Sequence, residues 1–146
     1  MMLLFVSWLI RYGHVIGAAT WVGGYAFLAF FIVPLVGKEP SETLIRLAIA
    51  IIRTLTYTGT LTMGLGLVLI TRTRGFAHLF GSAWGGLIIT GFVIAIALLG
   101  LGDGALRPTI IRSKEKGDSK ARRWAIAGFI LTVLAVGVMT GATFVS

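Results

Sequence analysis

The chain has 146 residues, of which 57% are hydrophobic and only 12% are charged, and its formal net charge is +8. A mean hydropathy of +0.97 excludes an ordinary soluble domain and is typical of one compact membrane bundle. Cysteine is absent, which excludes disulfides, thiolate metal sites and cysteine nucleophiles. Asparagine and glutamine are absent too, a composition that we interpret as that of a thermophile.

Four long apolar segments predict an all-α integral membrane protein that forms a single membrane domain over residues 1–146. Because about 20 residues cross the hydrocarbon core of a bilayer, we place the spans at about 12–36, 44–71, 81–102 and 124–145. Consecutive spans joined in this way predict an up-and-down bundle of four transmembrane helices. The segment from Leu3 to Ile10 is expected to lie near the interface or to extend a tilted first helix, and no cleavable signal peptide is expected.

The basic residues predict the orientation of this bundle. Ten of the thirteen lie in the first and third connections or at the adjoining start of the second span: Lys38, Arg46, Arg53, Arg107, Arg112, Lys114, Lys116, Lys120, Arg122 and Arg123. The positive-inside rule then predicts a cytoplasmic loop over 103–123, both termini on the outer side, and insertion into the plasma membrane of a prokaryote. This topological role accounts for the net charge, so no nucleic-acid partner is expected.

One helical face in the first span stands out chemically. His14, Ala18, Trp21 and Tyr25 follow one another at steps of four, three and four residues, so they share a face. A histidine at membrane depth costs free energy unless it is paired, and by default it marks a functional site. Glycines such as Gly17 flank this face and leave room beside the imidazole for a flat group or for another helix.

The predicted topology gathers several further residues at the outer side. His14 and His78 are the only histidines, and both belong there, whereas all five acidic residues belong to the other side. The remaining candidates at or near the outer level are Arg11, Arg72, Arg74, Met63 and Met139. A haem b site would account for this set, because haem needs axial ligands such as imidazole, and its propionates bind arginine well.

We therefore predict His14 and His78 as axial ligands, with Met63 or Met139 as other possible ligands in place of His78. Arg11, Arg72 and Arg74 would bind the propionates, while Trp21 and Gly17 would line the macrocycle. Each residue type also has a structural role: small residues separated by three positions pack helices together, arginines anchor at the interface, and methionines fill cores.

Several short motifs resemble a known membrane family. The pattern His14-x3-Ala18-x2-Trp21-x-Gly23-Gly24 is similar to the first helix of copper-resistance-D (CopD) type membrane domains, and the HemJ-type protoporphyrinogen oxidases share a similar opening. Arg53 with Thr58-Gly59, and the run from Gly85 to Ile89 with Leu106-Arg107-Pro108, resemble the second and third helices of that group. The resemblance implies a four-helix scaffold that handles haem or copper, with His14 as candidate ligand.

One feature separates this chain from the oxidase branch. The HemJ-type enzymes have a lysine in the third helix, whereas this chain reads Ile89-Thr90-Gly91 and has no lysine in that span. Porphyrinogen oxidation is therefore not the expected activity, although a role as part of a membrane oxidoreductase remains open.

Three functions are consistent with the sequence. The favoured one is a haem b-binding membrane redox protein that passes electrons from a quinol or a partner subunit to an acceptor on the outer side. The second is a copper-handling membrane protein, since imidazole and thioether ligands suit copper. The third is an accessory subunit of a larger respiratory complex, or a homodimer, joined through its glycine-rich faces.

Overall fold

The structure is a computed structural model that describes residues 1–112 and 119–145. Within these residues the chain is helical without any strand, and four helices are long and apolar enough to cross a membrane: Met2–Lys38, Glu42–Arg72, Ala83–Arg112 and Ser119–Gly141. The predicted all-α class with four apolar spans is confirmed. The helices differ from the predicted spans mainly in length, because the first begins ten residues earlier and the third ends ten residues later than expected.

The expected loop over 103–123 is the largest departure from the sequence prediction. Its first ten residues continue the third helix, its last five begin the fourth, and residues 113–118 lie outside the described part of the chain. Pro108 makes this continuity unexpected, because a proline lacks the backbone N–H and its ring clashes with the preceding helical turn.

The first and third helices both accommodate their proline with a π-helical stretch. The first consists of α1 (Met2–Phe27), η1 (Leu28–Ile32) and α2 (Val33–Lys38), and the third of α4 (Ala83–Gly100), η3 (Leu101–Leu106) and α5 (Arg107–Arg112). In each case the proline, Pro34 or Pro108, comes two residues after the π-helical stretch. The wider π turn relieves the clash of the ring with the turn before it, so the helix runs on instead of ending.

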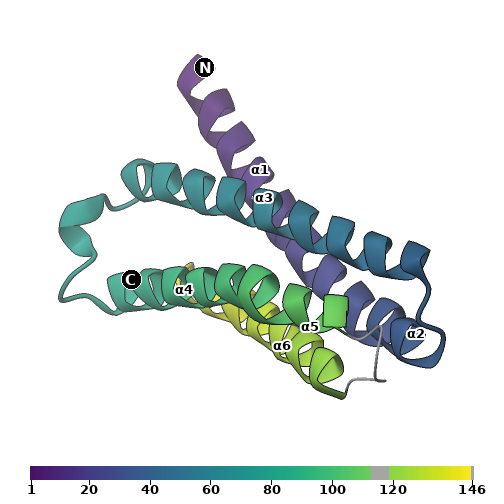
Figure 1. The fold of residues 1–146 in the computed structure, drawn as a ribbon. Coiled ribbons are helices and arrows are strands. Elements are labelled where there is room, and N and C mark those ends of the chain that lie inside the picture. Colours follow the sequence, from purple (N-terminus) through teal and green to yellow (C-terminus); the bar gives the residue numbers. More distant parts are fainter. Residues whose placement is uncertain (113–118, 146) are drawn as a thin grey trace.

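The remaining elements are α3 (Glu42–Arg72), the short η2 (Phe76–His78) and α6 (Ser119–Gly141). Helix α1 packs against α3 and α6, and α4 packs mainly against α6 (Figure 1). The N-terminal part of α1 extends beyond the other helices, and residues 1–5 of the chain are at least 60% exposed. Ser41 and Ser82 cap α3 and α4, accepting hydrogen bonds from the backbone N–H groups of Leu44 and Gly85 at 3.2 and 3.0 Å.

The bundle has two ends, one rich in basic residues and one that holds both histidines. The basic end comprises η1, α2, the first half of α3, η3, α5 and the start of α6. The histidine end comprises the N-terminal half of α1, the second half of α3, residues 73–82, the start of α4 and the end of α6. At the histidine end Gly75 and Gly81 have positive φ angles of 77° and 83°, which glycine adopts without strain, and they let the chain turn from α3 into α4.

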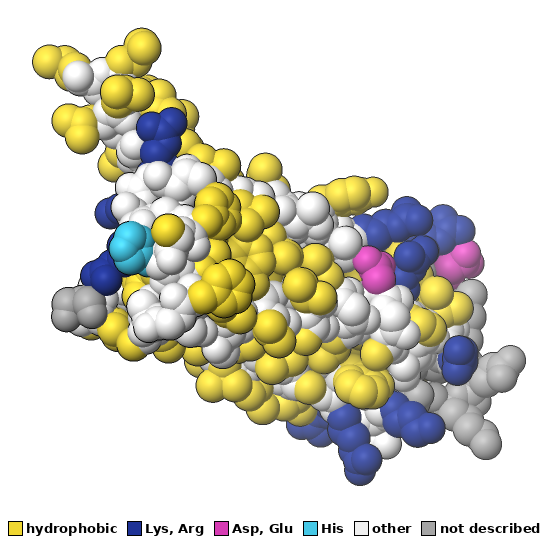
Figure 2. Space-filling model, turned by 90° about the vertical axis from the view of Figure 1, so that its left-hand side faces the viewer, with side chains coloured by type: hydrophobic (Ala, Val, Ile, Leu, Met, Phe, Trp, Pro, Cys, Tyr) yellow, Lys and Arg dark blue, Asp and Glu magenta, His cyan; other side chains and the backbone are white. Residues whose placement is uncertain are grey.

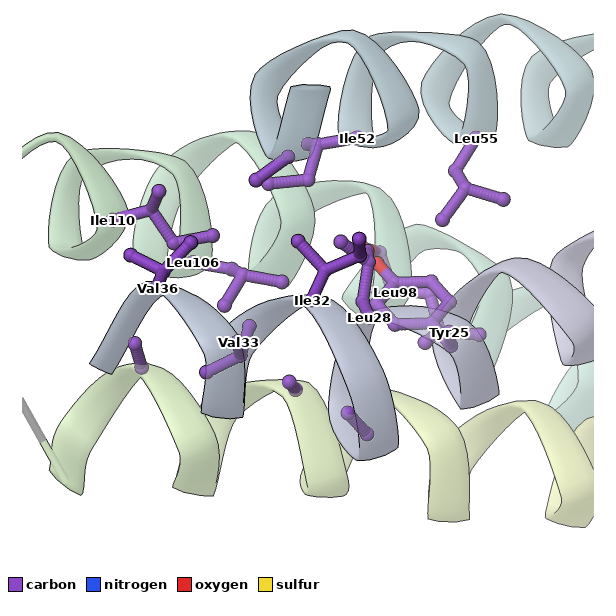
Figure 3. Packing of buried hydrophobic residues seen from close by; sticks show 14 of the residues in the cluster. Tyr25, Leu28, Ile32, Val33, Val36, Ile52, Leu55, Leu98, Leu106 and Ile110 are labelled. Atoms are coloured by element: carbon purple, nitrogen blue, oxygen red, sulfur yellow. The ribbon is translucent and has the colours of Figure 1, made fainter. Parts of the chain in front are cut away.

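The main hydrophobic core lies toward the basic end. Its fully buried side chains come from all three of the longest helices, with Leu28, Ile52, Leu98, Leu106 and Ile110 at no more than 2% exposure (Figure 3). The histidine end has a separate, smaller cluster, whose buried members are Ile70, Trp84 and Ala142. His14 contacts α3 at a level between these two clusters.

Candidate functional site

His14 lies on α1, partly buried against α3. Its Nδ1 is 2.9 Å from the carbonyl oxygen of Thr62. A carbonyl oxygen can only accept, so Nδ1 must carry the proton that it donates, and in the neutral ring Nε2 is then left with a free lone pair. Histidines that bind metals are held in this way, with one ring N–H donated to a carbonyl or carboxylate and the other nitrogen available to the metal.

Three side chains of α1, including His14, form hydrogen bonds to backbone carbonyls of other helices. Trp21 donates from Nε1 to the carbonyl of Leu55 at 2.6 Å, and Tyr25 donates its hydroxyl to the carbonyl of Leu98 at 3.0 Å. The three donors share the α1 face that the sequence predicts, and this shared face is confirmed. Each of them therefore links α1 to the backbone of a neighbouring helix.

A glycine stands four residues after each acceptor, where a side chain would otherwise cover the carbonyl. Gly59 follows Leu55, Gly66 follows Thr62 and Gly102 follows Leu98. A Cβ added at Gly66 would lie 3.2 Å from Cε1 of His14, one at Gly102 would lie 3.0 Å from the Tyr25 hydroxyl oxygen, and one at Gly59 would overlap the Trp21 ring. The glycines thus expose the carbonyls, and polar side chains of α1 use them to join helices.

His14 differs from the other two donors because its ring has a second nitrogen that the hydrogen bond does not use. The indole of Trp21 has no second nitrogen, and the ring of Tyr25 is buried in the main core. The imidazole of His14 keeps Nε2, and its ring lies beside Gly66, where Phe92 of α4 also comes near. Among the three, His14 alone combines a structural hydrogen bond with a vacant ligand atom.

His78 lies in η2, in the connection between α3 and α4, and is exposed. Its Nδ1 is 2.7 Å from the carbonyl oxygen of Arg74, so it too donates through Nδ1 and retains a lone pair on Nε2. His14 contacts α3 between Thr62 and Gly66, and His78 follows the end of α3 at Arg72. Both histidines therefore belong to the histidine end, His14 being the deeper of the two, and no hydrogen bond joins them.

The three predicted arginines occupy different settings at this end. Arg11 and Arg72 are exposed, and neither forms a hydrogen bond or ion pair within the described residues. Arg74 donates to the carbonyl oxygen of Val145 at 3.1 Å, and its guanidinium carbon lies 5.9 Å from the centre of the Trp84 ring. Arg74 thus clamps the connection between α3 and α4 to the C-terminal end of α6 and to the start of α4.

The other predicted site residues take part in helix packing. A Cβ at Gly17 would overlap the Thr62 side chain, so the space beside Gly17 is filled by α3. Trp21 is buried over Gly59, and Met139 of α6 lies against Gly91 of α4. Met63 packs against the main core. Within residues 1–112 and 119–145 there is no cluster of three or more His, Asp or Glu side chains suited to a metal ion.

A polar group that the sequence did not predict lies nearer the basic end. Thr56 donates its hydroxyl to Asp103 Oδ2 at 2.9 Å, and Arg107 pairs with Asp103 Oδ1 at 3.5 Å. Asp103 belongs to η3, so the third helix carries a carboxylate that contacts the middle of α3. The signal available in the sequence was the spacing of four residues between Asp103 and Arg107, which is typical of an ion pair on a helix.

Comparisons with known proteins provide no relative for this chain. No family model, curated protein or solved structure matches it.

Proposed function

We propose that this protein is a haem b-binding integral membrane protein that transfers electrons, with His14 as an axial ligand of the iron. The observation that carries the proposal is the hydrogen bond from Nδ1 of His14 to the Thr62 carbonyl, which in the neutral ring leaves the lone pair of Nε2 free for a ligand bond. A histidine inside a membrane helix is functional by default. The similarity of its surrounding motif to CopD-type domains points to the same chemistry.

The donors at the histidine end fit a haem better than they fit a bare metal ion. The free Nε2 of His14 suits axial ligation and exposed His78 offers a second such atom nearer the end of the bundle, whereas too few His, Asp or Glu side chains gather in the described residues to enclose an ion. Arg11 and Arg72, exposed and unpaired within the described residues, are suited to the propionates. The chemistry that haem supplies when bound is reversible one-electron transfer at the iron.

The packing limits where such a group would lie. The space beside Gly17 is occupied by Thr62, so the macrocycle would not sit between α1 and α3 at that point. Trp21 is likewise committed to Leu55 and Gly59. The proposed site therefore uses the side of His14 that faces Gly66 and Phe92, toward α4 and the smaller core cluster.

The proposed setting is the plasma membrane of a prokaryote, with the histidine end and both termini on the outer side. The excess of lysine and arginine at the basic end supports this orientation through the positive-inside rule. A quinol or a partner subunit would supply the electrons, and the acceptor would approach from the outer side.

The absorption spectrum of the purified protein is the direct test. Protein produced with sufficient haem should show a Soret band and, after reduction, a sharp α-band, and His14→Ala should lose both. Trp21→Phe is the matched control, because it removes a hydrogen bond from the same face of α1 and leaves both imidazoles intact. A colourless wild type, or a His14→Ala variant with the full spectrum, would refute the assignment.

The second axial ligand is tested separately. His78→Ala should convert the spectrum from that of a six-coordinate iron to that of a five-coordinate one, whereas Met63→Leu and Met139→Leu should leave it unchanged because both methionines pack against neighbouring helices. If Met139→Leu changes the spectrum and His78→Ala does not, the second ligand is the methionine. Bound copper in a colourless preparation would favour the copper-handling alternative.

A second candidate, the accessory subunit of a larger respiratory complex, is favoured by the N-terminal part of α1. This segment is apolar on all sides and extends past the other helices without packing on them. A partner helix would cover it. If the protein purified in mild detergent carries no cofactor and migrates in a stable larger assembly that removal of residues 1–10 disrupts, this candidate replaces the first. A stable homodimer lost in the same way would identify the partner as a second copy.

A further inference from the structure

Four arginines lie at one level of the bundle, although they come from three different helices. Thr56 of α3 contacts Asp103 of η3, and these two helices run in opposite directions. Arg53 precedes Thr56 by three residues and Arg107 follows Asp103 by four, so both lie about 5–6 Å toward the basic end from that contact, at a rise of about 1.5 Å per residue.

The fourth helix places two more arginines at the same level. Met139 of α6 lies against Gly91 of α4, and these helices are also antiparallel. Arg123 and Arg107 are each sixteen residues from that contact, toward the basic end. Arg53, Arg107, Arg122 and Arg123 thus lie at about one height on three of the four long helices, and together they form the arginine belt.

Most of the arginine belt has no acidic partner within residues 1–112 and 119–145. Arg53, Arg122 and Arg123 are exposed, and none of them forms a hydrogen bond or ion pair within the described residues. Arg107 is paired with Asp103 and is about one third exposed. The adjacent Trp124 is 42% exposed, as is usual for a tryptophan at the boundary between hydrocarbon and headgroups.

The distance to the other end of the apolar surface fits a bilayer. Arg53 and Arg72 are nineteen residues apart on α3, which is about 28 Å along a helix, and the hydrocarbon core of a membrane is about 30 Å thick. Between these levels the surface is apolar, and basic side chains gather at both of its ends (Figure 2). The acidic side chains seen in this view lie at the basic end only.

We infer that the arginine belt is a binding surface for anionic phospholipids of the leaflet at the basic end. The belt lies at the edge of an apolar surface, where lipid phosphates would be, and presents guanidinium groups that match phosphate with paired hydrogen bonds. A nucleic acid does not fit this arrangement, because acyl chains would cover the surface next to the arginines. The inference takes the four apolar helices to cross a bilayer and does not depend on haem.

Lipid binding by the full chain in a neutral detergent tests the inference. The protein is titrated with phosphatidylglycerol or with phosphatidylcholine of the same acyl chains, and bound lipids are counted by native mass spectrometry. The wild type should bind phosphatidylglycerol more tightly. Replacing Arg122 and Arg123 by glutamine should reduce this preference by about fivefold for each arginine removed, and Arg53→Gln by about fivefold.

The matched control removes the same charge from the opposite end. Arg11→Gln combined with Arg72→Gln should keep the full preference for phosphatidylglycerol, and replacement of Arg122 and Arg123 by lysine should keep most of it. Unchanged helicity and thermal midpoint confirm that each variant is folded. An equal loss in the control, or no loss in the belt variants, would overturn the inference. So would displacement of phosphatidylglycerol by inorganic phosphate, which would make the belt a site for the free anion.

Discussion

The two ends of this molecule are built in different ways. At the basic end, the apolar side chains that face the interior are buried almost completely, as for Leu28, Ile52, Leu106 and Ile110. Toward the histidine end, large apolar side chains point outward, including Tyr57, Leu61 and Val93, each at least 60% exposed. There the helices are joined by glycine contacts and by hydrogen bonds to backbone carbonyls.

The arginine belt lies within the main core, because Ile45 and Ile110 lie on its far side, whereas Leu55 and Leu98 lie between it and Arg72. Side chains beyond it, such as Val36, Ile45 and Ile110, face water if they are not covered, so the hydrophobic effect requires their burial. If the four helices cross a bilayer, as proposed, lipid tails surround the molecule between the belt and Arg72, and these are as apolar as leucine and provide no such requirement. In that setting, whether an apolar side chain must be buried depends on whether water or lipid surrounds the molecule at its level.

Two adjacent isoleucines at the basic end provide the largest expected effect. Ile110 is fully buried, and Ile111 is 48% exposed. Ile110→Ala should lower the free energy of unfolding by about 2–5 kcal/mol, because it removes buried methyl groups and leaves a cavity. Thermal and denaturant unfolding in one detergent would measure it. Ile111→Ala should cost much less, and equal losses would show that the basic end is not packed as described.

A pair of glycines on α1 tests the closer contacts toward the histidine end. Gly17 touches Thr62, whereas nothing lies within 4 Å of a Cβ at Gly23. Gly17→Ala should destabilise the bundle by about 1–3 kcal/mol, since α1 and α3 must move apart. Gly23→Ala should be neutral or slightly stabilising, because alanine favours helix. If both variants unfold like the wild type, α1 does not approach α3 as closely as described.

The smallest expected effect belongs to the hydrogen bonds of α1. Trp21→Phe removes the bond to Leu55, and Tyr25→Phe removes the bond to Leu98. Each should cost about 0.6 kcal/mol, the average for such bonds between membrane helices. His14→Phe should cost a similar amount of stability, measured by the same unfolding assay, yet it alone should abolish haem absorption. A large loss of stability in His14→Phe would make its role structural.

The sequence predicts the fold better than it predicts the lengths of the helices. Four apolar segments of about 20 residues determine four helices, since a bilayer leaves few alternatives for such segments. Asp103, Gly104 and Pro108 instead have the composition of a loop. The helix nevertheless continues, because η3 accommodates the proline, and Thr56 and Arg107 provide partners for the carboxylate. The contact between Thr56 and Asp103 depends on how two helices pack side by side, and a single sequence does not predict that packing.

The same limit applies to the candidate site. The spacing of His14, Trp21 and Tyr25 is sufficient to predict a shared face. It is not sufficient to predict which carbonyls they bind, since Thr62 and Leu55 come from a second helix and Leu98 from a third. The glycine four residues after each acceptor is a local signal that could have indicated them. Gly17, predicted to leave room for a flat group or for another helix, is the point at which α3 approaches α1.

The two prolines that follow π turns have a mechanical consequence. Pro34 and Pro108 each remove one backbone hydrogen bond from a long helix, so bending is easiest there, in the first and third helices. Both points lie in the basic end, away from the contact between His14 and Thr62. If the helices cross a bilayer, as proposed, we therefore expect them to flex at these joints when its thickness changes, so that the imidazole keeps its position while the basic end adjusts its tilt.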